Sequence, residues 1–295
     1  GAALARELEA TATGTIEEAI DAGIDALVIS ASTVAHAQLV QIGIAVGLPV
    51  FCEKPISLDV EAADRLADLV RVSNVPVQVG FQRRFDPGFR RAREMVQTGA
   101  IGRVYLVRMV AHDYEPPPAT FIAEVGGQFR DMHIHDFDLI PWVTGHPIVE
   151  VYAEGSVLID EAFERHDDVD TSALLLRLAD GSLSILSATR HDPLGYDVRM
   201  EVYGSGDSVV AGWDDRTPLR SLETDYQPPT GAPYKTFFER FEHAFQAEMA
   251  EFLRVARGEV DSPSTVEESR RSLRVAVAAE QSRRERRPIK IVSEG

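Results

Sequence analysis

Three short segments of this 295-residue chain carry side chains that could do chemistry. In one of them, Asp131, His135 and Asp138 follow at spacings of four and three, which would place them on one face of a helix. Asp131 could accept a hydrogen bond from His135, orient the ring and raise its basicity. The segment therefore predicts a general base; a capping aspartate with a structural histidine is the alternative.

The second segment is Glu53-Lys54-Pro55, which directly follows the apolar run 50–52. Pro55 restricts the backbone of Lys54, and a partly desolvated lysine can take part in proton transfer. A surface Lys–Glu pair before a turn is the alternative.

The third segment, 30–33, follows another apolar run and reads Ser-Ala-Ser-Thr. Its small residues would let a ligand approach the backbone, and the helix that follows would attract an anion at its N-terminus. Ser and Thr are also common helix caps, so helix capping is the alternative.

His133 and His135 raise the question of a metal site. Residues two apart on a helix point in nearly opposite directions, so the two rings could share a metal only on a strand. The sequence contains no second His or Cys cluster with a familiar ligand spacing. We therefore expect no metal, and a metal-dependent hydrolase is kept only as an alternative.

The elements that must position these residues change character after Gly80. Before it, strands are expected at 26–30, 50–52 and 75–79, and they alternate with helices expected at 16–22, 34–46 and 59–72. This alternation predicts a doubly wound parallel sheet, whose ligands bind beyond the carboxyl ends of the strands. The segments at 30–33 and 53–55 would both lie at that edge.

After residue 80 the pattern predicts a mostly antiparallel sheet with helices, because turn signals separate short strand-like runs. The expected strands are 104–111, 149–155, 171–178, 183–189, 198–203, 208–213 and 288–292, and the expected helices are 89–97, 131–142, 237–257 and 266–286. We expect two domains, 1–80 and 81–295. The run 171–178 is apolar on both faces, which predicts helices on one side of the sheet and a second subunit on the other.

Composition argues against several classes of function. The 47 acidic residues outnumber the 30 basic ones, and a net charge of −17 disfavours nucleic-acid binding. The arginine-rich run 283–287 is expected to end a helix. No apolar stretch is long enough for a membrane span, and no signal peptide is visible. The single cysteine, Cys52, allows no internal disulfide and fits the cytoplasm.

The run 50–58, which contains Glu53-Lys54-Pro55, resembles the glucose–fructose oxidoreductase / inositol 2-dehydrogenase (Gfo/Idh/MocA) family. So do the runs 80–87, 99–102 and 131–138, while 237–241 and 262–268 look like its bacterial myo-inositol 2-dehydrogenase branch. The likeness covers nearly the whole chain. It implies a Rossmann domain followed by a substrate-binding domain with an open, mostly antiparallel sheet. It also implies a dehydrogenase that transfers a hydride between a polyol or sugar alcohol and NAD or NADP.

The resemblance also implies roles for individual residues. His135 matches the general base, Lys54 the lysine that hydrogen-bonds the reacting oxygen, and Asp131 its acidic partner. The substrate-side positions are Arg84, Asp138 and Tyr196, and the cofactor-side positions are Ser30, Ser32, His36, Glu53 and Lys54. The family further implies a cis Lys54–Pro55 bond and a homodimer or homotetramer.

The family's first strand and its Gly-x-Gly-x-x-Gly loop have no counterpart in these residues. The first βαβ unit is therefore expected either to lie outside this sequence or to be missing from the protein. The residue that selects NAD or NADP would lie in the same unit. A binding or scaffold protein that derives from the family, without tight cofactor binding, is the alternative to an enzyme.

Overall fold

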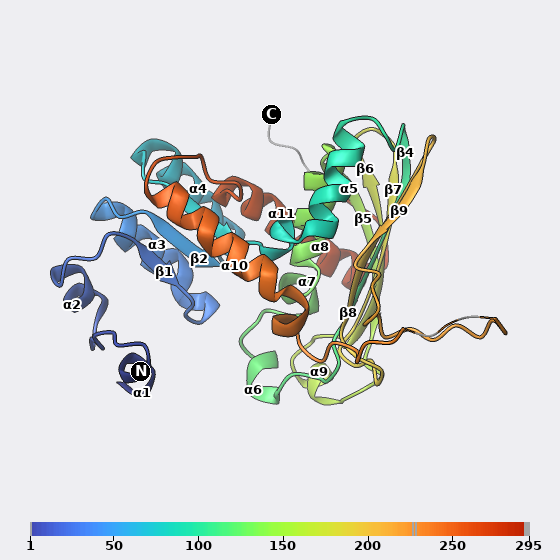
Figure 1. Ribbon diagram of the computed structural model, residues 1–295, viewed down its shortest axis with the longest axis horizontal. Helices are drawn as coiled ribbons and strands as arrows, with labels where there is room; N and C mark the ends of the chain where they lie inside the picture. Colours follow the sequence, from blue (N-terminus) through green and yellow to red (C-terminus); the bar gives the residue numbers. More distant parts are fainter. Residues whose placement is uncertain (1, 226, 228, 292–295) are drawn as a thin grey trace.

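A three-stranded parallel sheet forms the first part of the computed structural model, which describes residues 2–225, 227 and 229–291 (Figure 1). Its strands are β1 (Leu27–Ile29), β2 (Val50–Glu53) and β3 (Val77–Gly80), in that order across the sheet. The register aligns Ile29 with Cys52 and Cys52 with Val79, so the three carboxyl ends meet at one edge. The predicted parallel sheet is confirmed.

Helices α3 (Thr33–Ala45) and α4 (Val60–Ser73) connect these strands. The side chain of Asp59 accepts a hydrogen bond from the backbone N–H of Ala62 and so caps α4. Asn74, in the left-handed conformation at φ 58°, ends that helix. Two short helices, α1 (Ala2–Glu7) and α2 (Ile16–Asp21), precede the sheet and lie to one side of it in Figure 1.

The second part is built on a seven-stranded sheet with the order β10-β5-β6-β7-β4-β8-β9. Its strands are β4 (Val104–His112), β5 (Ile148–Ser156), β6 (Thr171–Leu178), β7 (Leu183–Thr189), β8 (Asp197–Gly204), β9 (Ser208–Ala211) and β10 (Ile289–Lys290). Neighbouring strands are antiparallel except β4 and β7, which are parallel. The sheet is therefore mostly antiparallel, as predicted.

Helices cover one face of this large sheet, the face turned toward the parallel sheet (Figure 1). They are α5 (Pro87–Gln97), α7 (Gln128–Asp131), α8 (Ile134–Thr144) and α11 (Val266–Glu285). Strand β6 alternates buried and exposed residues, so its outer face is open. Leu175 on β6 and Ile185 on β7 are 45% and 44% exposed there. No described element covers the second face that the sequence predicted to be covered.

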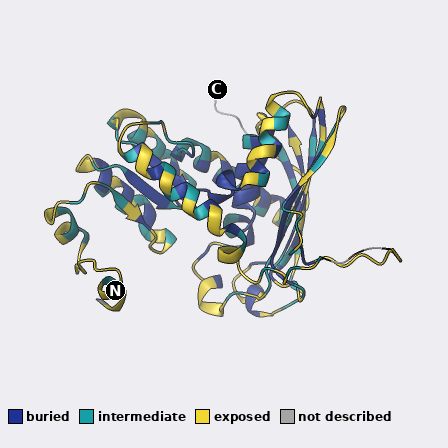
Figure 2. Ribbon diagram, in the orientation of Figure 1, coloured by how far each residue is buried: buried dark blue, intermediate teal, exposed yellow. Residues whose placement is uncertain are grey.

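The C-terminal helices return to the parallel sheet. Helix α10 (Phe237–Ala256) packs on it through Phe252, whose ring meets Phe51 edge-on at 5.6 Å. Helix α11 reaches α4, where Arg274 pairs with Asp64 at 2.8 Å. The strands of the parallel sheet all end by Gly80, and the later helices pack on both parts of the molecule. Figure 2 shows buried residues in both sheets and in the helices between them. Among the described residues, no helix is long and apolar enough to cross a membrane.

The helix predicted at 131–142 differs from the observed structure. It is split into α7 and α8, with Met132 and His133 between them, and Pro141 lies inside α8. Three further short helical segments are η1 (Gln82–Phe85), α6 (Ala119–Ile122) and α9 (Ala162–Arg165). The break after Asp131 changes how that residue faces His135, which matters for the site.

Candidate active site

Lys54 follows the last residue of β2 and points across to helix α7. Its Nζ donates hydrogen bonds to the Asp131 carbonyl oxygen at 2.8 Å and to Asp131 Oδ1 at 2.9 Å. The Lys54–Pro55 peptide bond is cis, as the sequence resemblance implied. Lys54 and Asp131 stand 77 positions apart in the sequence. Their contact therefore joins the carboxyl edge of the parallel sheet to the helices of the second part.

Asp131 has a second cationic partner that the sequence analysis missed. Arg190 NH1 lies 2.9 Å from Asp131 Oδ2 and 3.2 Å from Asp113 Oδ2. Burial opposes ionisation of Asp131, but the charges and hydrogen bonds of Lys54 and Arg190 outweigh it and hold its pKa far below the usual range. Asp131 is therefore a carboxylate that fixes Lys54 in place.

The parallel pairing of β4 with β7 explains why Asp113 and Arg190 meet. His112 and Thr189 are register partners at the ends of the two strands, so the residues that follow them are neighbours. The hairpin signals in the sequence predicted antiparallel neighbours and could not show this pair. Burial raises the pKa of Asp113, although the charge of Arg190 opposes that rise.

His135 lies in the first turn of α8 and is 7% exposed. Its ring meets the ring of Phe81 edge-on at 6.0 Å. Nδ1 is buried and has no hydrogen-bond partner. Nε2 is not among the buried atoms that lack a partner. Burial, followed by the charges of Arg83 and Lys54, lowers the pKa of His135 well below 6.5. The ring is therefore neutral at pH 7 and able to accept a proton.

The hydrogen bond predicted between Asp131 and His135 is not present. Both carboxylate oxygens of Asp131 are engaged by Lys54 and Arg190. The break between α7 and α8 removes the continuous helical spacing on which that prediction depended. His135 is instead oriented by its packing.

Arg83 is a further residue that sequence reasoning missed. Its NH1 lies 2.6 Å from Asp136 Oδ1, and Asp136 Oδ2 lies 2.8 Å from His133 Nδ1. His133 Nε2 is 2.9 Å from Ser172 Oγ on β6. This buried series of contacts, from Arg83 through Asp136 and His133 to Ser172, holds Arg83 beside His135. The adjacent arginines at 83 and 84 were the available signal, but spacing alone could not tell which one faces the site.

The contacts of His133 in this series also bear on the hypothesis of a metal site. Both ring nitrogens of His133 are already hydrogen-bonded, so His133 cannot join His135 as a ligand. Among residues 2–225, 227 and 229–291, no group of three His, Cys, Asp or Glu side chains is arranged to hold a metal ion.

Arg84 and Asp138, predicted as substrate contacts, form a buried ion pair with each other. Arg84 Nε and NH2 donate to the Asp138 carboxylate at 2.8 and 2.6 Å, and Arg84 NH1 donates to Pro263 O and Glu268 Oε1. The polar atoms of both side chains are thus used within the protein. Arg83, and not Arg84, is the arginine whose charge acts on the candidate base.

Tyr196, the third predicted substrate residue, directly precedes β8 and is buried, with its ring centroid 6.4 Å from that of Phe241. Burial raises the pKa of its hydroxyl, while Arg83 and Arg240 oppose the rise. The charge of Arg83 acts to lower the pKa of both Tyr196 and His135, which indicates that both side chains lie near Arg83.

The predicted cofactor residues follow the carboxyl edge of the parallel sheet. Ser30 and Ser32 are exposed, and Ser32 makes no capping hydrogen bond although it precedes α3. His36 is buried, with Nδ1 2.8 Å from Pro55 O and Nε2 3.0 Å from Ala31 O. It therefore joins the loops after β1 and β2 rather than facing a ligand. Burial raises the pKa of Glu53, which lies beside Gly80.

These features fit a dinucleotide. The uncapped Ser32 leaves its hydroxyl and the positive end of α3 available to a ligand. A Cβ at residue 80 would lie 3.1 Å from the Glu53 carboxyl group, so the glycine leaves room for that side chain at the sheet edge. Lys54 and His135 lie at the end of the same edge.

Comparisons with known proteins agree with this geometry. The sequence model of the oxidoreductase family with an NAD-binding Rossmann fold matches residues 1–81, and that of the GFO/IDH/MocA C-terminal domain matches residues 89–210. A myo-inositol dehydrogenase of Streptomyces leeuwenhoekii is 38% identical over 92% of this chain and 83% of its own length. The myo-inositol 2-dehydrogenase of Thermotoga maritima is 35% identical over 92% of this chain and 81% of its own.

Solved structures give the same result. A myo-inositol dehydrogenase from Corynebacterium glutamicum superposes with a TM-score of 0.89 at 30% identity, covering 99% of this chain and 87% of that one. The scyllo-inositol dehydrogenase of Lactobacillus casei with bound NAD(H) and scyllo-inositol has a TM-score of 0.81 at 29% identity, covering 92% and 82%.

Proposed function

The chain belongs to the GFO/IDH/MocA oxidoreductase family, and we propose that it oxidises a secondary alcohol of an inositol-like cyclic polyol. It is an NAD-dependent oxidoreductase that acts on CH–OH groups. The observation that carries the assignment is the contact of Lys54 with Asp131 beside a neutral, buried His135.

His135 takes the hydroxyl proton of the substrate in this proposal. A neutral imidazole is the protonation state that a base requires, and its lowered pKa keeps it neutral at pH 7. Because Nδ1 is buried, Nε2 is the nitrogen that receives the proton.

Lys54 stabilises the negative charge that develops on the substrate oxygen. Its ammonium group is held in one position because Asp131 accepts its hydrogen bond and Arg190 holds Asp131 in turn. Arg83 and Tyr196 are the side chains that would contact the other hydroxyls of the ring.

Ser30, Ser32 and Glu53 would hold the cofactor along the carboxyl edge of the parallel sheet, and His36 fixes the two loops that form this edge. When bound there, NAD supplies the hydride acceptor for the carbinol carbon.

The test measures NAD affinity by tryptophan fluorescence and NADH formation at 340 nm with myo-inositol and scyllo-inositol. We expect saturable NAD binding and polyol-dependent NADH formation. NAD binding without turnover of any polyol would reject the dehydrogenase. No NAD binding at millimolar concentration would instead favour the scaffold alternative.

We also propose that two copies associate through the open face of the large sheet. Leu175 and Ile185 lie on adjacent antiparallel strands as direct register partners, so they form one exposed apolar area. A second copy would cover this area by an isologous contact and give a dimer or tetramer. Light scattering should show an oligomer that Ile185→Glu dissociates; a monomeric unmodified protein would reject the proposal.

The family assignment further suggests a cytoplasmic enzyme. A single cysteine, Cys52, is buried and free, so the fold requires no disulfide. Cell fractionation would test this location.

A further inference from the structure

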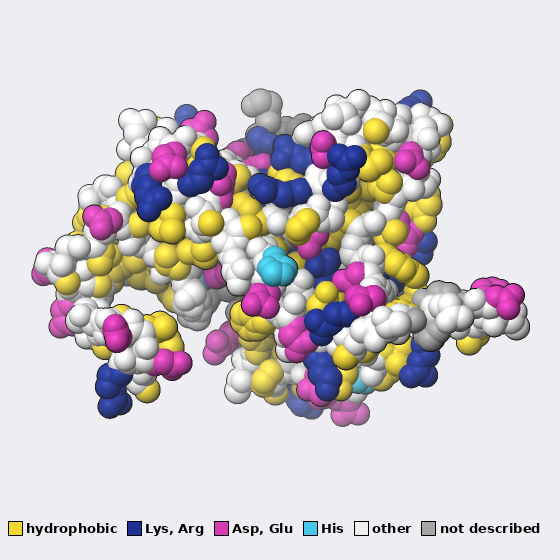
Figure 3. Space-filling view, viewed as in Figure 1, with side chains coloured by type: hydrophobic (Ala, Val, Ile, Leu, Met, Phe, Trp, Pro, Cys, Tyr) yellow, Lys and Arg dark blue, Asp and Glu magenta, His cyan; other side chains and the backbone are white. Residues whose placement is uncertain are grey.

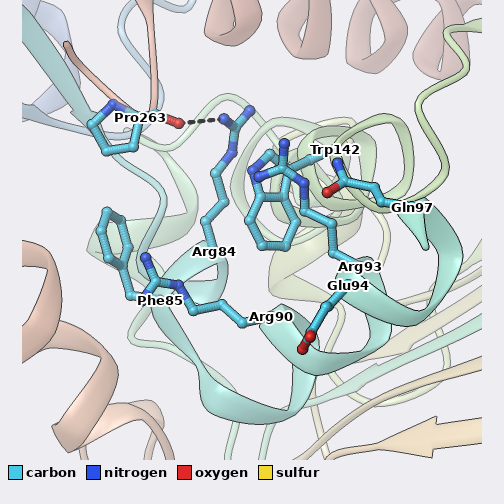
Figure 4. Close-up of a pocket in the computed structure, with 8 residues that line it drawn as sticks. All are labelled: Arg84, Phe85, Arg90, Arg93, Glu94, Gln97, Trp142 and Pro263. Carbon is cyan, nitrogen blue, oxygen red and sulfur yellow. Dashed lines mark hydrogen bonds between the residues drawn. The ribbon is translucent and has the colours of Figure 1, made fainter. Parts of the chain in front are cut away.

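A separate hollow lies where η1, α5 and α8 meet the loop before α11 (Figure 4). Its volume is about 240 Å³, below the roughly 300–1,000 Å³ of pockets that bury drug-sized ligands. None of Lys54, Asp131 and His135 lines it. The lining side chains are Arg84, Phe85, Arg90, Arg93, Glu94, Gln97, Trp142 and Pro263.

Three arginines converge on this hollow, and two of them have no carboxylate partner. Arg84 is neutralised by Asp138 and Glu268, at 2.6 and 2.9 Å. Among the described residues, neither Arg90 nor Arg93 lies within salt-bridge distance of an Asp or Glu. Two positive charges thus lack a direct carboxylate partner in a chain whose net charge is −17.

Aromatic rings support these two guanidinium groups. Arg93 lies over the Trp142 ring at 4.3 Å and Arg90 over the Phe85 ring at 5.5 Å. A stacked guanidinium keeps the N–H groups of its edge available for hydrogen bonds. The side-chain oxygen of Gln97 accepts from Arg93 Nε at 2.8 Å and NH2 at 3.2 Å, so part of the Arg93 edge remains for a ligand. Figure 4 shows Arg84, Arg90 and Arg93 around one space, with Trp142 behind Arg93.

The single acidic residue of the lining does not neutralise the pair. Glu94 Oε2 lies 2.7 Å from Arg91 NH1, and Arg91 does not line the hollow. Burial lowers the pKa of Arg93, and the charges of Arg84 and Arg90 lower it further, while the charge of Glu268 opposes the shift. An anion in the hollow would remove this repulsion.

We propose that this pocket binds the phosphoryl group of inorganic phosphate or of a small phosphate monoester. A phosphate dianion matches the two charges of Arg90 and Arg93, neither of which has a direct carboxylate partner, whereas one carboxylate would neutralise only one of them. Guanidinium groups also bind tetrahedral oxyanions through paired N–H···O bonds. The volume suits a small ester and is too small for a dinucleotide.

The test is calorimetric titration of the protein, saturated with NAD so that the cofactor's own phosphate sites are filled. The probes are inorganic phosphate and glycerol phosphate, with glycerol as the uncharged control. Binding of phosphate alone would identify the free ion, and binding of glycerol phosphate alone would identify an ester; either result supports the pocket. No saturable heat with either probe up to about 10 mM would overturn it, because such binding is weaker than about 3 kcal/mol.

The variants Arg93→Gln and Arg90→Gln test whether phosphate binds in this hollow. Each should weaken binding at least about tenfold, the value of one charge-assisted hydrogen bond. Arg65→Gln, on the exposed surface of α4, removes the same charge elsewhere and should leave the affinity unchanged. Equal affinity in Arg93→Gln, Arg90→Gln and the parent protein would place the phosphate elsewhere and reject the proposal. If one pocket variant fails to fold, the other decides.

Discussion

Replacing Asp131 by Asn should destabilise the protein by about 3–5 kcal/mol at pH 7, the usual loss when one partner of a buried ion pair is removed. The carboxylate faces Lys54 and Arg190, each at 2.9 Å. At an effective dielectric constant of about 20, each contact corresponds to about 6 kcal/mol of Coulomb attraction. The desolvation of three charged groups offsets most of that attraction, and the expected loss arises because the buried charges of Lys54 and Arg190 would no longer face a carboxylate at residue 131.

The assay is urea unfolding of Asp131→Asn and of a matched control, Asp68→Asn. Asp68 pairs with Arg71 at 2.8 Å, but both side chains are more than 70% exposed. Solvent screens that pair, so the control should lose no more than about 1 kcal/mol. Equal losses in the two variants would refute the view that burial gives the Asp131 contacts their strength.

The pH dependence of this loss follows from the lowered pKa of Asp131. A carboxylate with a depressed pKa in the folded protein contributes stability above its unfolded pKa of about 3.9, and this stability disappears as the pH falls through the folded value. The difference between the parent protein and Asp131→Asn should persist at pH 5 and shrink below pH 4. The variant should also lose roughly 10²-fold in kcat, because Lys54 is no longer held in position.

Four further outcomes are expected. His135→Ala should lower kcat by about 10²–10⁴-fold with little change in the Kd for NAD; near-normal turnover would remove its role as base. In the pH profile of kcat/KM, the acidic limb should lie below 6.5, because burial, Arg83 and Lys54 lower the pKa of His135 and only the neutral ring accepts a proton. Arg83→Gln should move that limb upward, and an unmoved limb would show that Arg83 does not act on the base. Phe137→Ala should cost about 3–5 kcal/mol in urea unfolding, because the side chain is buried and leaves a cavity; a loss below 1 kcal/mol would contradict this.

Local patterns were sufficient to predict most of the fold. The alternation of apolar runs and helices before Gly80 predicted the parallel sheet, and short strands with turn signals predicted the second sheet. The error at 131–142 arose because apolar and polar periodicity continues through Met132 and His133, where the helix breaks. The periodicity of apolar residues predicts which face of a helix is buried, but it does not reveal where two residues interrupt the helix.

The candidate site could be predicted only in part. Spacing made Lys54, Asp131 and His135 candidates, each with a structural alternative, and the family resemblance supplied their expected roles. Arg84 was predicted to contact the substrate, whereas in the structure it pairs with Asp138 and Glu268, and Arg83 acts on His135. Adjacent residues share the same sequence context, and only packing decides their directions. Arg190 carried no motif at all, and its role depends on contacts with residues far away in the chain.

The sequence by itself predicted the strand and helix types and the two sheets, because these depend on local spacing and residue chemistry. The family resemblance added Lys54, Asp131 and His135 as the candidate reactive groups. Only the tertiary structure decided which groups meet. The parallel pairing of β4 and β7 joins Asp113 to Arg190, and the break after α7 turns Asp131 toward Lys54 and Arg190 instead of toward His135. Such contacts depend on strand order and helix ends across the whole chain, which spacing along the sequence does not specify.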